Sequence, residues 1–193
     1  MKNNKIQLRG GLVIAIIAFA AFSRLIPHPW NFTPIAAIGL FGAAYFSKKS
    51  MAIIIPFAAL FISDLLVNNI YYPVFFPEFY KGFTLMAGGA LWQYGAFALI
   101  IGLGLLTLKK VKPMGLIGTG IGASILFFLV TNFGVWLSYP AMYGSTPAGL
   151  MACYTAAIPF FWNTVAGDLF YIGLMFGSFE YLKNSYPSLA FSK

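Results

Sequence analysis

Polar side chains that interrupt long apolar runs are the residues of this chain that could do chemistry. Six of them lie within or next to such runs: Arg24, Asp64, Gln93, Asn132, Asn163 and Asp168. A charged group in a hydrocarbon core costs at least ~2.5 kcal/mol on insertion scales, so each should face the protein interior or a wet cavity and have a partner. These positions predict a buried polar network, a ligand site, or both.

The residues themselves leave two interpretations open for each charged group. Arg24 is the nearby cation for Asp64, so the two predict an ion pair that stabilises the fold, whereas contact of either one with a substrate is the alternative. Asp168 lies some ten residues into the last apolar run, where a packing role and a proton-related role are both open. For the amides we favour hydrogen bonds between helices over ligand contacts; they are Gln93, Asn132 and Asn163.

The chain has one histidine, His28, and one cysteine, Cys153. One histidine with one distant cysteine is a weak metal signature, and no Cys/His/Asn spacing surrounds Cys153. A single cysteine also excludes an internal disulfide. We therefore predict no metal site, no cofactor and no catalytic residue, so that the protein is not an enzyme, and the role of Cys153 stays open.

The composition is typical of an integral membrane protein. Hydrophobic residues make up 60% of the 193 positions and charged residues 8%, against roughly 25% charged in a soluble domain. The apolar runs predict six membrane-spanning helices in a single domain over residues 1–193: 11–26, 34–47, 51–68, 84–107, 115–138 and 158–182. No small-x-small cleavage pattern follows Ala21, so the first run is kept as a span rather than a signal peptide.

The basic residues set the predicted topology. The net charge is +8, but the cations lie in the connections between apolar runs and form no single patch, which argues against a nucleic-acid partner. With six spans and both termini inside, the positive-inside rule is satisfied by ten cations within and two, Arg24 and Lys81, outside. If the short run 34–47 turned back instead, the split would be four against eight, so six crossings with an N-in/C-in topology is the prediction.

Three outward connections follow from this topology: 27–33, 69–83 and 139–157. They are long, aromatic and rich in proline, and they predict an outward recognition surface. Small residues four apart, as in Gly11/Ala15, Gly39/Ala43, Ala98/Gly102 and Gly118/Gly122, predict close contacts between helices.

The stretch RLIPHPWNFTPIAAIGLFGAAYF, followed by PFAALFISDLL, resembles a family of uncharacterised bacterial proteins thought to be transport proteins. More broadly, six spans, cytoplasmic termini and an outward cavity resemble the substrate-binding S components of energy-coupling-factor (ECF) transporters. That resemblance implies the bacterial inner membrane, a scarce vitamin-like substrate, and an ECF transmembrane scaffold with ATPase subunits as partners. The stretch AIIAFAAF departs from the A-x-x-x-A pattern through which S components dock, and the chain has no G-x-x-x-x-G-K-[ST] ATPase sequence.

The leading hypothesis is therefore uptake of a small micronutrient from the extracytoplasmic side. The predicted substrate-binding residues are Arg24, His28, Trp30, Asn31, Asp64, Asn68, Gln93, Asn132 and Trp136. The alternative is a proton-coupled carrier that uses Asp64 and Asp168 as titrating sites. A membrane-embedded enzyme ranks lower, because no spacing of His, Cys, Ser and acids supports catalysis. Substrate, energy source and oligomeric state are not determined by the sequence.

Overall fold

The computed structural model describes residues 2–186 and 189, with side chains from residue 8 onward, and this part of the chain is helical with no strand. The α-helices are α1 (Lys2–Phe22), α2 (Ile35–Tyr45), α3 (Lys49–Leu66), α4 (Tyr72–Phe75), α5 (Ala90–Thr107), α6 (Pro113–Ser138), α7 (Pro140–Tyr143) and α8 (Pro147–Ser185). A 3₁₀ turn, Ser23–Leu25, ends α1, and a π-helical turn, Val67–Tyr71, joins α3 to α4.

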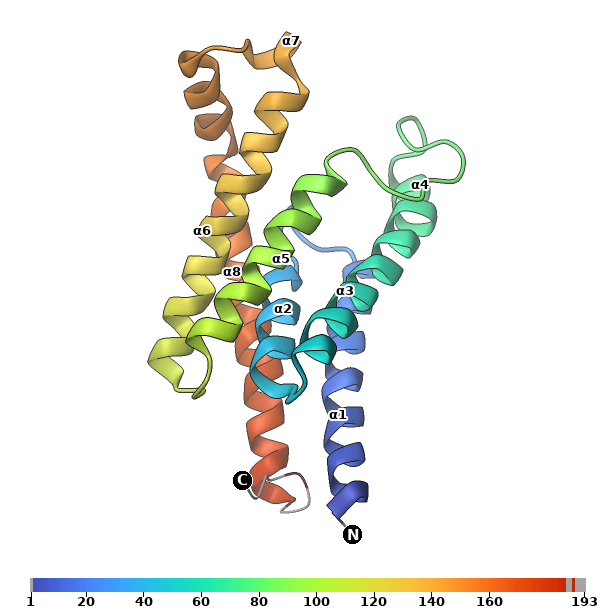
Figure 1. Cartoon of the computed structure of the whole chain (residues 1–193). Coiled ribbons are helices and arrows are strands. Elements are labelled where there is room, and N and C mark those ends of the chain that lie inside the picture. The colour runs from blue at the N-terminus through green and yellow to red at the C-terminus, as the bar shows by residue number, and fades with distance from the viewer. Residues whose placement is uncertain (1, 187–188, 190–193) are drawn as a thin grey trace.

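Helices α1, α2, α3, α5, α6 and α8 run alternately up and down, and the start of α1 and the end of α8 lie at the same end of the molecule (Figure 1). The short helix α2 is the centre of the bundle: it packs against α1, α3, α5, α6 and α8, and all of its residues except Ala44 are buried. Its 11 residues extend only ~16 Å along the axis, about half of a hydrocarbon core. The segment 26–34, most of which is exposed, leads from the end of α1 to the buried start of α2.

Four helical stretches are long and apolar enough to cross a membrane. They are Leu8–Leu25, Lys49–Phe75, Ala90–Thr107 and Pro113–Ser138, and the shorter apolar helix Ile35–Tyr45 lies between the first two. Many large apolar side chains on the outside of the bundle are exposed, Phe19 and Leu106 among them, as expected of a surface that faces lipid. The chain thus has the fold of an α-helical membrane protein.

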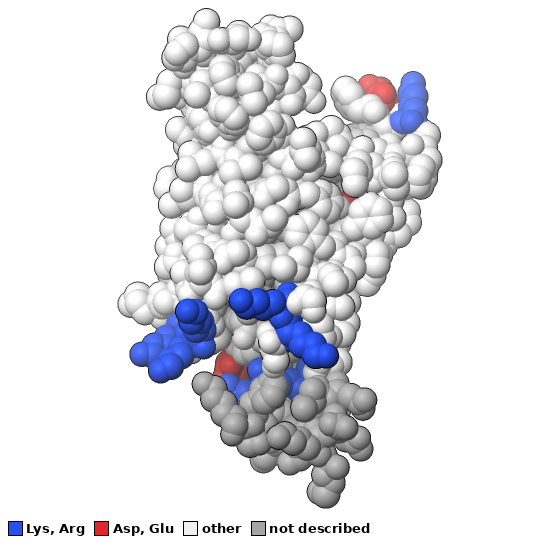
Figure 2. All heavy atoms as spheres, in the orientation of Figure 1, with Lys and Arg blue, Asp and Glu red and all other residues white. Residues whose placement is uncertain are grey.

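Basic side chains gather at the end where the termini lie, which we call the basic end, whereas most of the visible surface above it carries no charge (Figure 2). The connections at this end are residues 46–48, before α3, and residues 108–112, before α6. Tyr45 donates a hydrogen bond to Glu180 Oε1 over 2.7 Å, and Lys183 pairs with the same carboxylate. The hydrogen bond from Tyr45 joins α2 to α8 at the basic end.

Two predicted span boundaries differ from the ends of the helices. The fourth span was expected from residue 84, but α5 begins at Ala90, because Gly89 has a left-handed φ of 82° that ends the irregular segment before it. The last span was expected from residue 158, with 139–157 as a loop. Instead α8 begins at Pro147, since Thr146 caps the helix through its side chain and proline suits the first helical position.

The connection expected over residues 69–83 is also shorter than predicted. The helix that begins at Lys49 continues past Leu66 through the π-helical turn and ends only at Phe75. The remaining segment is tied down by Asn69, whose side chain donates to Thr84 O over 2.8 Å and accepts from Thr84 N over 2.7 Å. A single amide therefore closes the loop between α4 and α5.

Most of the small-residue pairs do not make the predicted helix contacts. Methyl groups added at Gly11, Gly102 and Gly118 would meet nothing within 4 Å. The pair on α2 is the exception: a methyl group on Gly39 would lie 3.0 Å from Phe97, and one on Gly104 would lie 2.8 Å from Ala43 Cβ. Among these pairs, only the one on α2 therefore packs closely, and it packs against α5.

Candidate functional site

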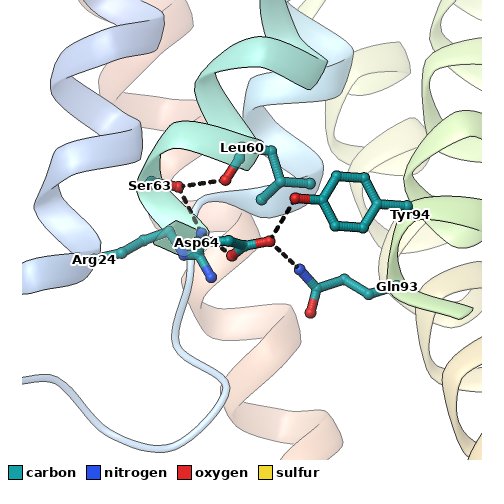
Figure 3. Close-up of polar contacts among 6 residues, drawn as sticks. All are labelled: Arg24, Leu60, Ser63, Asp64, Gln93 and Tyr94. Atoms are coloured by element: carbon teal, nitrogen blue, oxygen red, sulfur yellow. Dashed lines mark hydrogen bonds and ion pairs between the residues drawn. The ribbon is translucent and has the colours of Figure 1, made fainter. Parts of the chain in front are cut away.

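Two charged residues, Arg24 and Asp64, meet inside the bundle. The 3₁₀ turn at the end of α1 directs Arg24 toward α3, where its Nη1 lies 2.6 Å from Asp64 Oδ1. The same nitrogen donates to Ser63 Oγ over 2.6 Å, and Ser63 in turn donates to Leu60 O. Figure 3 shows the guanidinium and the carboxylate face to face between α1 and α3. The predicted pairing of Arg24 with Asp64 is confirmed.

Helix α5 completes the environment of the carboxylate. Asp64 Oδ2 accepts hydrogen bonds from Gln93 Nε2 over 3.0 Å and from Tyr94 Oη over 2.8 Å (Figure 3). Each carboxylate oxygen thus has a donor, which is the condition for burying a charge without a large penalty. The predicted interhelical hydrogen bond of Gln93 is confirmed. We call Arg24, Ser63, Asp64, Gln93 and Tyr94 the charged cluster.

The charged cluster lies nearly out of contact with solvent. The Arg24 side chain is 9% exposed and that of Asp64 is 13% exposed. A pair at this depth is strongly destabilising to break, because the partner that remains keeps an uncompensated charge. It joins the end of α1, α3 and α5, and its residues take part in the lining of the cavities described next.

Three cavities adjoin the charged cluster. The aromatic cavity, about 200 Å³, lies between the segment after α1 and the π-helical turn, and its lining includes Arg24, His28, Trp30, Tyr71, Tyr72 and Phe76. The polar cavity, about 180 Å³, lies on the other side of the ion pair, and its lining includes Arg24, Asp64, Asn68, Tyr80, Gln93 and Tyr94.

The third cavity, about 340 Å³, is the largest of these three and lies between α5, α6 and α8. Its lining includes Trp92, Gln93, Phe128, Thr131, Asn132 and Phe160. Asn31 is shared with the aromatic cavity and Gln93 with the polar cavity, while Arg24 and Tyr72 line both smaller ones. The three cavities are therefore neighbours around one set of side chains.

Eight of the nine predicted binding residues line at least one of these cavities. They are Arg24, His28, Trp30, Asn31, Asp64, Asn68, Gln93 and Asn132. Trp136 is the exception, since its indole N–H donates to Gly144 O over 2.8 Å and steadies the turn before α8. The predicted interhelical hydrogen bond of Asn132 is wrong, because its amide donates to Phe128 O on its own helix over 2.8 Å.

The segment 26–34 carries five of the lining residues, which are His28, Pro29, Trp30, Asn31 and Thr33. His28 Nδ1 lies 2.6 Å from Ile26 O, which requires the tautomer protonated at Nδ1, and its ring stacks on Tyr71. Asn31 has a left-handed φ of 63°, a conformation that asparagine tolerates better than most residues. Because the chain turns at Asn31, this short segment contributes to the walls of two cavities.

Glycine on α8 lets this segment lie against the bundle. A methyl group on Gly167 would lie 2.8 Å from Thr33 N and 3.0 Å from Phe32 C and Cα. These are backbone atoms, which cannot move away as a flexible side chain can. The absence of a side chain at Gly167 is therefore what permits the close approach of the segment that leads into α2.

Sequence reasoning missed several residues of the site. Ser63 and Tyr94 contact the charged pair directly. Each is next in sequence to a predicted site residue, Asp64 or Gln93, but consecutive residues do not share a helix face, so this adjacency alone does not predict their role. Serine and tyrosine are too common in membrane helices to stand out by type alone.

Asp168 has a different role from the charged cluster. It is 2% exposed, and it accepts a hydrogen bond from Ser124 Oγ over 2.7 Å and another from the backbone N–H of Ala36. Ala36 lies in the first turn of α2, where backbone N–H groups have no acceptor within the helix, and the residue before α2 is Pro34, which gives no side-chain cap. Asp168 therefore caps α2 from a neighbouring helix, and none of the three cavities includes it.

Replacing Asp168 by alanine should lower the free energy of unfolding by about 2–3 kcal/mol, because Ser124 and the start of α2 both lose a buried acceptor. Asp168→Asn keeps one acceptor oxygen and should cost less. Thermal unfolding of the detergent-purified variants measures the difference. Equal stability of Asp168→Ala and the wild type would contradict the capping role.

Metal ligation has little support in the described residues, among which no group of three His, Cys, Asp or Glu side chains lies close enough to hold an ion. Cys153 is buried, and its thiol points at Asn132 O over 3.5 Å. The side chains of the charged cluster and its cavities are suited to binding a small molecule and fixing its orientation. They offer one cation, one anion, amide groups and aromatic faces.

The fold and the site define the class as an α-helical membrane protein with a buried charged cluster and adjoining cavities. The chain belongs to a family of unknown function, DUF6580, whose model matches residues 4–189. No curated protein and no solved structure matches it.

Proposed function

We propose that this protein is the substrate-binding membrane subunit of an uptake system for a small micronutrient, similar to the S components of ECF transporters. The observation that carries the proposal is the set of three adjoining cavities beside the charged cluster, two of which are lined by Arg24 and the third by Gln93. Concave sites with apolar walls and a few converging polar groups are typical of small-molecule binding. Eight of the residues expected to bind substrate from the sequence lie there.

The proposed topology has six crossings with both termini in the cytoplasm of a bacterial inner membrane. It is supported by the alternating direction of the helices, by both termini lying at one end, and by the basic side chains at that same end (Figures 1 and 2). The aromatic and polar cavities would then open toward the outside, through the segments 26–34 and 76–89. Capture from the extracytoplasmic side follows from this orientation.

The lining points to a ligand that is flat and has no net charge. The charged side chains that line the three cavities are Arg24 and Asp64, and they neutralise each other. An anion or a cation would have to break this pair at the cost of a buried, unpaired charge. Amides at Asn31, Asn68, Gln93 and Asn132 offer donors and acceptors, and the aromatic rings offer faces on which a planar group can stack. A vitamin-like heterocycle fits this chemistry.

Energy for transport would come from partner proteins. The resemblance to S components implies a transmembrane scaffold and ATPase subunits, and the chain itself has no phosphate-binding loop sequence. The protein would bind and deliver the ligand, and would not be an enzyme.

A proton-coupled carrier is the second candidate. The observation that favours it is Asp168, a carboxyl group 2% exposed in the middle of the bundle and with no cationic partner among the described side chains. Such a carrier would concentrate substrate in liposomes under a pH gradient alone. The binding subunit would require its ATPase partners for the same accumulation.

The decisive experiment measures equilibrium binding of a panel of vitamins and their precursors to the purified protein. We expect one member to bind at micromolar concentration or below, and Asn132→Ala to weaken it about tenfold, the equivalent of one hydrogen bond in a site of this kind. Asn163→Ala is the matched control, because this α8 amide lines none of the three cavities and should leave affinity unchanged. A panel without any binder, or equal effects of the two variants, would contradict the proposal.

A further inference from the structure

A fourth cavity lies at the basic end, away from the charged cluster. It is an apolar groove of about 620 Å³ between α6 and α8. Its lining includes Pro113, Leu116 and Ile117 on α6, and Leu169, Ile172, Gly173, Phe176 and Gly177 on α8. Because positions three and four apart share one face of a helix, both helices present a continuous apolar surface to this groove.

The groove exists because α6 and α8 touch higher up and separate toward the basic end. A methyl group on Gly120 would lie 2.6 Å from Ile172 Cδ1, and Ser124 donates to Asp168 just beyond this contact. Toward the start of α6 the two helices diverge (Figure 1). Methyl groups at Gly173 and Gly177 would meet nothing within 4 Å, so these glycines leave the floor of the groove open.

Positive charge lies at the mouth of this groove. Lys109, Lys110 and Lys112 immediately precede the first lining residues of α6, with Val111 between them as part of the lining itself. All three lysines are exposed. Within residues 8–186 and 189 the ion pairs are Arg24 with Asp64 and Lys183 with Glu180, so these lysines have no acidic partner there.

One acidic residue, Glu180, lines the groove, and its negative charge is neutralised by a partner. Glu180 forms part of the lining, but Lys183 pairs with its carboxylate and Tyr45 donates a hydrogen bond to it. The mouth of the groove therefore keeps the net positive charge of its three lysines.

We infer that this groove is a specific site for an anionic phospholipid, with an acyl chain along α6 and α8 and the phosphate among the three lysines. Apolar walls alone cannot distinguish one lipid from another, because all lipid tails are about as apolar as leucine. Selection comes from the headgroup, since lysines close to a membrane surface favour anionic lipids and basic pockets between helices bind their phosphates. This inference does not depend on the function of the charged cluster or of its cavities.

Native mass spectrometry tests this site. The intact protein is extracted from vesicles that contain equal amounts of phosphatidylglycerol and phosphatidylcholine, and the lipid that stays bound is identified. We expect one retained phosphatidylglycerol per chain. Gly173→Phe should abolish retention because its ring fills the groove, and replacing Lys109, Lys110 and Lys112 together by glutamine should reduce the preference for phosphatidylglycerol by roughly tenfold or more.

Matched controls make the outcome specific. Gly118→Phe adds the same ring at an exposed position of α6 outside the groove, and Lys48→Gln with Lys49→Gln removes charge at the same end of the molecule. Both controls should retain the lipid as the wild type does. Retention by Gly173→Phe, an equal loss in the Lys48/Lys49 variant, or a groove occupied by a second protein chain instead of lipid would overturn the inference. Circular dichroism of each variant excludes loss of the fold as the cause.

Discussion

Arg24→Met is expected to lower the free energy of unfolding by about 3–5 kcal/mol, the usual cost of removing one partner from a buried ion pair. Asp64 would keep its hydrogen bonds from Gln93 and Tyr94, but its charge would have no cation, and Ser63 would lose its donor. The end of α1 would also lose its connection to α3. Thermal unfolding in detergent, followed by circular dichroism, measures the loss.

The double variant Arg24→Met with Asp64→Leu separates the cost of an unpaired charge from the value of the pair. Replacing both members of a buried pair by apolar residues of similar size is often close to neutral. We therefore expect the double variant to be more stable than Arg24→Met alone. If the two substitutions simply added, the pair would not be coupled in the way its 2.6 Å distance implies.

Ligand binding by the double variant then distinguishes the two roles that the sequence leaves open. A purely structural pair predicts that a stable double variant still binds the ligand found in the vitamin panel. A pair that also contacts substrate predicts a loss of affinity of tenfold or more without a loss of fold. The position of Arg24 and Asp64 on the walls of the aromatic and polar cavities leads us to expect the second result.

Gly167→Ala is expected to destabilise the protein by about 2–3 kcal/mol and to weaken ligand binding as well. The new methyl group would lie within 3.0 Å of the backbone of Phe32 and Thr33, and such overpacking forces backbone shifts. The shift would displace the segment that carries His28, Trp30 and Asn31 into the cavities. Unfolding temperature and affinity should therefore fall together.

Gly177→Ala on the same helix is the matched control. Its methyl group would meet no atom within 4 Å, so the substitution should be neutral or stabilise α8 by roughly 0.5–1 kcal/mol through lower backbone entropy in the unfolded chain. Equal behaviour of the two alanine variants would show that the close approach at Gly167 does not determine where the segment lies.

Several features of the fold follow from local sequence. Long apolar runs predict membrane helices because the length of a helix must match the bilayer, and the bounds of α2 and α6 agree with the predicted runs to within two residues. The start of α8 was missed because prolines and glycines in 139–157 were interpreted as loop signals. At the start of a helix proline is favourable, and Pro159 lies inside α8.

The faces of the helices could not be predicted in the same way. In a soluble protein the apolar face of a helix shows where the core lies, but a helix in lipid is apolar on every side, so the pattern does not show which face is inside. Gly11, Gly102 and Gly118, where an added methyl group would meet nothing within 4 Å, illustrate this, whereas Gly167 and Gly134, which make close contacts with Thr33 and Trp92, had no distinguishing signal.

By itself, the sequence determined that the protein is helical, that it belongs in a membrane, and that Arg24 and Asp64 should pair, because few charges can stay in lipid without a partner. Only the tertiary structure decided that Tyr94 and Ser63 complete this pair, that Asp168 caps α2, and that cavities adjoin the cluster. These features depend on how helices far apart in the chain rotate and approach each other. That geometry is set by packing among many side chains at once, which no local pattern records.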